Sequence, residues 1–102
     1  NLQTPDAHSV PAKGKITLYR VQVAGLGIGT GENKTEAELM VTLDNDPKMV
    51  YTLRLDPTAP PANQVLAETL RDAYISNTPV TLYRQIAPGK NIFKIHMVQL
   101  EK

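Results

Sequence analysis

The apolar residues of one segment, residues 63–77, recur at the spacing of an α-helix. Leu66, Leu70 and Ala73 fall at positions i, i+4 and i+7, so one side of this helix is expected to be buried. The other faces carry mostly polar residues: Gln64, Glu68, Arg71 and Asp72. No other segment of the sequence predicts a helix.

The two ends of this helix are marked by proline and asparagine. Pro60 and Pro61 precede it, and Asn63 is expected to cap its first turn. Asn77 and the nearby Pro79 end it, because the residue before a proline avoids helical backbone angles.

The segments on either side of the helix have the alternating pattern of strands. Leu39, Val41 and Leu43 alternate with polar residues, turn residues follow at 44–47, and the alternation then resumes, so residues 37–55 predict a hairpin. After the helix, two more strands are predicted, at residues 80–86 and 92–100. The last strand is apolar on both faces, which is typical of a strand buried on both sides or covered by a neighbouring chain.

Residues 15–28 are strand-like but change face repeatedly. A long, bent strand that contributes to two sheets explains this pattern. Four glycines at alternate positions would lie on one face of it, either as a bend leading into a loop or as a groove open to a ligand: Gly25, Gly27, Gly29 and Gly31. The run lacks the third glycine of a dinucleotide-binding fingerprint and no helix follows, so phosphate binding is not predicted here.

Size and charge restrict the function further. The chain has 102 residues, which is enough for one domain with a core. Its 11 Lys and Arg nearly balance its 10 Asp and Glu, so no broad phosphate-binding surface is predicted. There is no cysteine, and no run of 18 apolar residues that would predict a membrane span.

The sequence gives no sign of an enzyme, a metal site or a cofactor. His8 and His96 stand apart from other ligand types, and a metal site needs several converging donors. The acidic turn at residues 44–47 lacks the twelve-residue spacing of a calcium loop. No acid–base pair or activated nucleophile is recognisable, so we expect a non-enzymatic protein without a cofactor.

The start of the chain is polar and contains two prolines. Residues 1–13 predict a flexible N-terminal arm, and residues 14–102 predict the folded domain. The first residue is Asn1 rather than Met, from which we hypothesise that a secretory signal peptide has been removed; a start chosen for expression would look the same. The expected location is secreted or periplasmic.

Three strands, one helix and two strands, with a bent first strand, predict an all-β fold with one helix. In this order the elements match a five-stranded Greek-key barrel of the OB type, with the helix between the third and fourth strands. A small barrel with unpaired edges and no disulfide would gain stability by pairing those edges in a closed ring of subunits.

The helix and the strand after it resemble the same region of the B subunits of AB5 bacterial toxins. Residues 69–74, Thr-Leu-Arg-Asp-Ala-Tyr, are similar to the cholera and heat-labile enterotoxin group. Ala73-Tyr74 with Pro79-Val80 and Leu82-Tyr83 is similar to the pertussis and subtilase-type B subunits. Elsewhere the agreement is limited to length and the order of elements.

This resemblance implies a ring-like homo-oligomer, with a pentamer favoured, that recognises a cell-surface glycan or a protein partner. It implies an A-type protein partner docked above a central pore, and helices that line this pore through Gln64, Glu68, Arg71 and Asp72. The chain departs from the enterotoxins because it has no Trp and no cysteine pair. The candidate ligand-binding residues are therefore those near the turn after the fourth predicted strand: Tyr83, Gln85, Lys90 and Asn91.

Two other functions are compatible with the sequence. The first is a structural or assembly OB-fold protein of the cell envelope that binds no glycan. The second is single-stranded nucleic-acid binding, which requires stacking aromatics and a basic groove. Four Tyr, one Phe and a net charge of +1 supply these poorly, so nucleic acid is the least favoured of the three binding partners.

Overall fold

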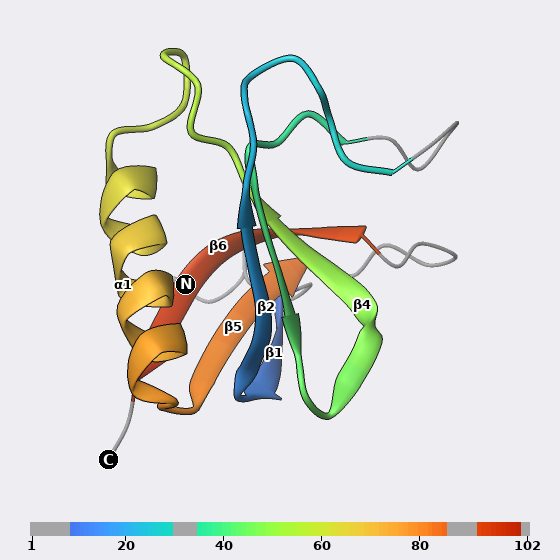
Figure 1. Cartoon of the computed structure of the whole chain (residues 1–102), viewed down its shortest axis with the longest axis vertical. Helices are drawn as coiled ribbons and strands as arrows, with labels where there is room; N and C mark the ends of the chain where they lie inside the picture. Colours follow the sequence, from blue (N-terminus) through green and yellow to red (C-terminus); the bar gives the residue numbers. More distant parts are fainter. Residues whose placement is uncertain (1–8, 30–34, 86–91, 101–102) are drawn as a thin grey trace, which may run out of the picture.

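The computed structural model of the chain describes residues 9–29, 35–85 and 92–100. The fold is mostly β with one helix, as predicted, and α1 lies along one side of the strands (Figure 1). The elements follow one another in the order β1 (Ser9–Gly14), β2 (Ile16–Val21), β3 (Leu39–Leu43), β4 (Asp46–Leu53), α1 (Ala62–Ser76), β5 (Val80–Gln85) and β6 (Ile92–Leu100).

The six strands form one sheet in the order β1-β5-β6-β4-β3-β2. All neighbouring strands are antiparallel except β4 and β6, which run parallel. The first residues of β6 pair with β4 and the later ones pair with β5. β6 is thus the strand that joins the two halves of the sheet.

The sheet differs from the predicted five-stranded barrel in strand number and in closure. It has six strands, and within the described residues no ladder joins β1 to β2. These two end strands are nevertheless separated by Lys15 alone, so the sheet must curl until its ends meet at that residue. The arrangement is OB-like, but the prediction of a closed barrel with five strands is wrong.

The additional strand comes from the segment predicted as an N-terminal arm. Strand β1 pairs with β5 from Ser9↔Gln85 to Gly14↔Val80, so residues 9–13 belong to the sheet. Pro11 is tolerated because β1 is an end strand, which needs ladder hydrogen bonds on one edge only. The polar, proline-containing sequence gave no alternation from which this strand could be recognised.

The predicted bend in the first strand lies earlier than expected. It falls at Lys15, between β1 and β2, and β2 already ends at Val21. The segment that follows is a loop, because three of its glycines have left-handed φ angles of 96°, 71° and 89°: Gly25, Gly27 and Gly29. The prediction of a strand through Ile28 is therefore wrong, and Gly31 lies outside the described residues.

The hairpin predicted at residues 37–55 is confirmed as β3 and β4, joined at Asp44 and Asn45. The helix predicted at residues 63–77 is also confirmed, within one residue at each end. Asn77 has a left-handed φ of 59° and ends the helix as its C-cap.

The start of the helix differs from the prediction. Its N-cap residue is Pro61, which supplies no side-chain hydrogen bond. Asn63 does not cap the helix; its amide Nδ2 donates a hydrogen bond to the carbonyl oxygen of Arg54 at 2.8 Å. Asn63 thus ties the helix to the segment that enters it.

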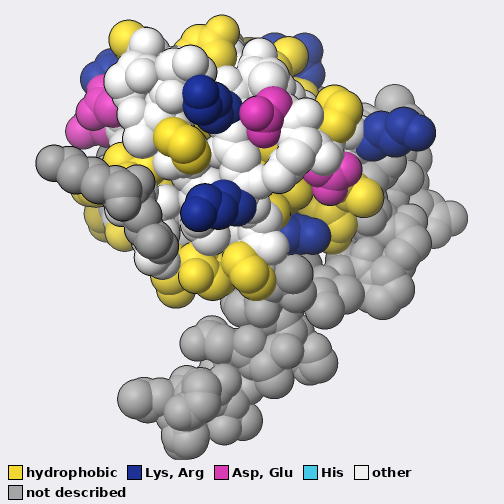
Figure 2. All heavy atoms as spheres, turned by 90° about the horizontal axis from the view of Figure 1, so that it is seen from below, with side chains coloured by type: hydrophobic (Ala, Val, Ile, Leu, Met, Phe, Trp, Pro, Cys, Tyr) yellow, Lys and Arg dark blue, Asp and Glu magenta, His cyan; other side chains and the backbone are white. Residues whose placement is uncertain are grey.

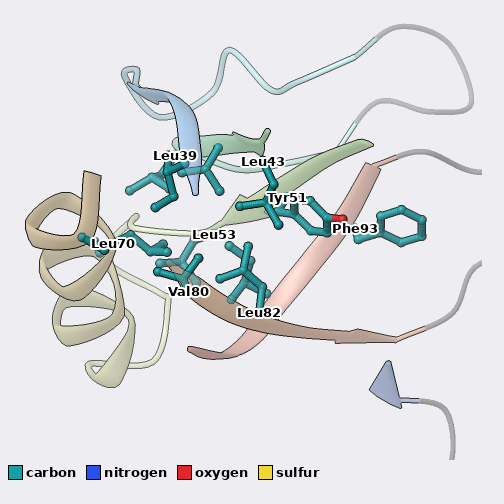
Figure 3. Close-up of a cluster of buried hydrophobic side chains, with 13 residues drawn as sticks. Leu39, Leu43, Tyr51, Leu53, Leu70, Val80, Leu82 and Phe93 are labelled. Carbon is teal, nitrogen blue, oxygen red and sulfur yellow. The ribbon is translucent and has the colours of Figure 1, made fainter. Parts of the chain in front are cut away.

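The helix buries one face against β2 and β6. Leu70 and Ala73 are buried as predicted, Ala67 is buried beside them, and Leu66 is half-buried. Together with strand residues they form one core cluster, which in Figure 3 extends from Leu70 of α1 to Tyr51 and Phe93 at the opposite end. No helix in the described parts of the chain is long and apolar enough to span a membrane.

Candidate ligand-binding hollow

An open hollow of about 300 Å³ lies where the sheet fails to close. Its lining residues are Pro11, Ala12, Lys13, Asn45, Asp46 and Arg84. Three of them are consecutive in β1, and consecutive strand residues point to opposite faces of a sheet. The hollow therefore follows an edge of β1, and since β5 occupies the other edge, it faces the turn between β3 and β4.

That turn is fixed to the junction of β1 and β2 by hydrogen bonds. The backbone N–H of Lys15 donates to Asp44 Oδ1 at 3.1 Å, and the N–H of Asp44 donates to the carbonyl of Lys15 at 2.9 Å. The amide Nδ2 of Asn45 donates to the carbonyl of Lys13. A Cβ at Gly14 would lie 2.6 Å from Asp44 Oδ1, so this close approach requires glycine.

Arg84 forms the wall of the hollow that borders the core. Val80 and Leu82 of β5 face the core, and Arg84 has the same phase. Its guanidinium carbon lies 4.8 Å from the centre of the Phe93 ring and 5.5 Å from that of Tyr51. A guanidinium stacked on aromatic faces keeps its N–H groups available in its own plane.

Tyr51 contributes a buried polar atom at the same end of the core. Its side chain is fully buried, and its hydroxyl has no hydrogen-bond partner among the described residues. Figure 3 shows the hydroxyl on the side of the ring next to Phe93, away from Leu39. Burial raises the pKa of the Tyr51 hydroxyl, and Arg84 opposes this change. The hydroxyl is therefore neutral and can act as a donor at physiological pH.

The hollow offers cations, an amide and a carboxylate, which suits a polar ligand with several hydroxyl groups. Lys13 and Arg84 donate hydrogen bonds, Asp46 accepts them, and the Asn45 side chain can do both. Within the described residues no group of three His, Asp or Glu side chains could hold a metal ion. The arrangement is one for binding.

The predicted ligand-binding residues do not line this hollow. Tyr83 is half-buried on β5, directly beside Pro11 of β1, and its hydroxyl lies 3.4 Å from Gln99 Oε1 of β6. It has the opposite phase to Arg84 and so faces the outer side of the sheet. Gln85 is the last residue of β5, while Lys90 and Asn91 lie outside the described residues.

The four predicted pore residues are all on α1 and all exposed: Gln64, Glu68, Arg71 and Asp72. Arg71 and Asp72 approach to 3.7 Å, with side chains 57% and 70% exposed, so this ion pair adds little stability. Two large apolar side chains, Val65 and Ile75, are exposed near the two ends of the same helix. The outer side of α1 is therefore not a purely polar surface.

A second hollow, of about 290 Å³, lies between residues 55–61 and the first turn of α1. Asp56 stabilises its wall by accepting hydrogen bonds from Arg54 and from the N–H and hydroxyl of Thr58. The hydrogen bonds from Thr58, followed by those from Arg54, lower the pKa of Asp56. The buried Glu38 also holds this segment, because its Oε1 accepts the N–H of Leu55 at 2.7 Å.

The sequence analysis missed Lys13, Asn45, Asp46 and Arg84 as site residues. Lys13 was assigned to the arm, and residues 45 and 46 were interpreted as an ordinary turn. One signal was present: Arg84 occupies a core-facing position in the alternation of Val80 and Leu82. A charged residue at such a position indicates either a partner or a site.

Comparison with known proteins supports the fold and leaves the sequence without a family. No protein-family model matches the chain, and a search of curated proteins finds no match. A solved structure, of human heat-labile enterotoxin in complex with a blood group A antigen analogue, is similar to it with a TM-score of 0.68. The two chains share 18% identity over 99% of this chain and 93% of that one. The fold is therefore similar to that of the toxin chain, as the resemblance in the helix region predicted.

Proposed function

We propose that this protein is a non-enzymatic binding module that recognises a glycan at the hollow beside β1. The main support is the combination of a toxin-like fold with an open, polar hollow at the gap in the sheet. The similar toxin structure holds a blood group antigen analogue, which is a glycan ligand on this fold. Tyr83, Gln85, Lys90 and Asn91 remain part of the proposal as a second set of contacts around the end of β5.

The glycan proposal is tested with a glycan array probed by the purified chain and by variants of the hollow. Asn45→Ala removes an amide beside Lys13, and Lys13→Ala removes a cation from an exposed edge. Both are expected to lower binding at least several-fold, whereas Lys94→Ala on the exposed side of β6 is a matched control that leaves it unchanged. Absence of any glycan binding by the native chain would contradict the proposal.

We also propose that the module forms a ring-like homo-oligomer, with a pentamer favoured. Strand β2 pairs only with β3 in the described chain, so one of its edges is open. The exposed apolar side chains gather on β2, α1 and β6: Leu18, Val21, Val65, Tyr74, Ile75, Met97 and Leu100. An open edge surrounded by apolar side chains favours pairing with a second copy. Gln64, Glu68, Arg71 and Asp72 would then line a pore, with an A-type partner above it.

The mass of the protein in solution tests this assembly. Light scattering is expected to give a multiple of the 11.2 kDa chain mass, and Ile75→Asp is expected to reduce it. Asn77→Asp, just beyond the helix, adds the same charge and serves as control. A monomer at micromolar concentration would contradict the ring.

A structural role in the cell envelope without a glycan is the second candidate, and the same exposed apolar side chains favour it. It predicts an oligomer that binds nothing on the array. Single-stranded nucleic acid has no comparable support, because Lys and Arg side chains are interspersed with Asp and Glu on the face shown in Figure 2. A secreted or periplasmic location belongs to both proposals.

A further inference from the structure

We infer that Arg84 is the specificity-determining residue of the hollow and that the glycan bound there carries an acidic group. This inference rests on the proposed glycan binding and adds the chemical class of the ligand. It is argued from the position of one guanidinium and from the balance of charge around it.

Arg84 is fixed in position before any ligand arrives. Its guanidinium lies over the rings of Phe93 and Tyr51, and these two rings are themselves in contact, with centres 6.1 Å apart. Both aromatic side chains are buried, so the stack cannot move without disturbing the core. A guanidinium immobilised in this way loses little conformational entropy when it binds an anion.

The orientation of the stack leaves the edge of the guanidinium to serve a ligand. The aromatic rings occupy a face of the cation and accept no in-plane hydrogen bond. A carboxylate or a sulfate matches in-plane guanidinium donors with two oxygens at once. A neutral hydroxyl group offers one oxygen and no charge, so the acidic group gains more from the same residue.

The charges around the hollow also favour an anion. Lys13 and Arg84 place two positive charges on its lining, and Asp46 places one negative charge there. Asp44, on the adjoining turn, accepts the backbone N–H of Lys15, whose ammonium adds a further positive charge nearby. Asp46 is then suited to accept hydrogen bonds from sugar hydroxyl groups, while Lys13 and Arg84 attract the acid.

Tyr51 adds a donor at the side of the hollow that borders the core. Its hydroxyl is buried without a partner in the described chain, and its ring supports the guanidinium. An unpartnered buried hydroxyl is uncommon, because it loses hydrogen bonds to water without replacement. A ligand oxygen or an ordered water beside Arg84 would restore this hydrogen bond.

The experiment compares three glycans that share one core and differ at one position, which is neutral, carboxylated or sulfated. Binding to the full purified chain is measured by calorimetry at low and at physiological salt. At least one acidic form is expected to bind about tenfold more tightly than the neutral form. The carboxylated and sulfated forms distinguish the two sources of the charge, and the preference is expected to weaken with salt.

Two variants assign the preference to its residue. Arg84→Met keeps a long side chain over the rings, and it is expected to abolish the preference for the acidic form while retaining binding of the neutral one. Lys13→Met, at an exposed position with no role in folding, is expected to reduce the preference without abolishing it. Lys94→Met removes one positive charge elsewhere and is the control.

The outcomes separate this inference from the proposed function. Equal binding of neutral and acidic glycans, or an unchanged preference in Arg84→Met, overturns the role of Arg84 and leaves glycan binding intact. Absence of binding to all three glycans and to the array overturns both. If Arg84→Met unfolds, Lys13→Met still decides, because an unchanged preference there removes the hollow as the origin of the charge selection.

Discussion

The core has two ends that are closed in different ways. At one end α1 covers it with Ala67, Leu70 and Ala73, all buried and apolar. At the other end, Tyr51 and Phe93 are covered by the guanidinium of Arg84, beside the polar hollow (Figure 3). Helix and sheet thus exclude water from the first end, while the second borders solvent.

This difference indicates a division of roles within a small domain. An apolar end contributes free energy of folding in proportion to the area it buries. A stacked cation contributes less to folding, and it keeps hydrogen-bond donors for a ligand. We therefore expect variants at the α1 end to change stability and variants at the Arg84 end to change binding.

The largest expected effect is at the α1 end. Leu70→Ala leaves a cavity between α1 and the sheet at a fully buried position, and it is expected to lower the free energy of unfolding by about 3 kcal/mol. Urea denaturation measures the loss. Ile75→Ala on the same helix is the control, since this side chain is 72% exposed and its loss is expected to cost less than about 0.5 kcal/mol in the monomer.

Glu38 connects the α1 end to the segment that leads into the helix. Glu38→Ala leaves the N–H of Leu55 without its side-chain acceptor and is expected to cost about 2 kcal/mol. Glu38→Gln keeps an acceptor oxygen and should retain most of that stability. Equal losses in the two variants would show that the hydrogen bond is not what Glu38 contributes.

Gly14→Ala tests the wall of the hollow at the opposite end. The new Cβ would meet Asp44 Oδ1, displace the turn from the β1–β2 junction and cost about 1 kcal/mol. Its larger consequence is expected in glycan binding, because Asn45 and Asp46 move with the turn. A variant that loses stability but binds normally would contradict the assignment of the turn to the site.

The smallest effect is a pH dependence at Asp56. Its pKa is lowered from 3.8 by hydrogen bonds from Thr58 and Arg54, so its stabilising contribution is complete above that value and is lost as the pH falls through the lower folded-state pKa. Asp56→Asn is expected to make unfolding less dependent on pH in this acidic range. Thermal melts of both proteins from neutral pH downward measure it, and parallel curves would contradict the role of Asp56.

Local patterns predicted the helix and the hairpin well. The spacing of Leu70 and Ala73 reports the buried face of α1, and the alternation around the turn at residues 44–47 reports β3 and β4. These signals are readable because each depends on one element and on one buried face. Asn63 shows the limit, since its amide bonds to Arg54 across the approach to the helix rather than to the helix itself.

The sequence by itself determined the class of fold: one amphipathic helix, a hairpin and further strands, with a helix region like that of toxin B subunits. Only the tertiary structure decided that residues 9–13 join the sheet, that the sheet stays open, and that Lys13 and Arg84 meet beside Asn45. The physical reason is that an end strand depends on its partner rather than on its own alternation. A site at the gap between two ends of a sheet depends on contacts between residues more than thirty positions apart, which no local pattern records.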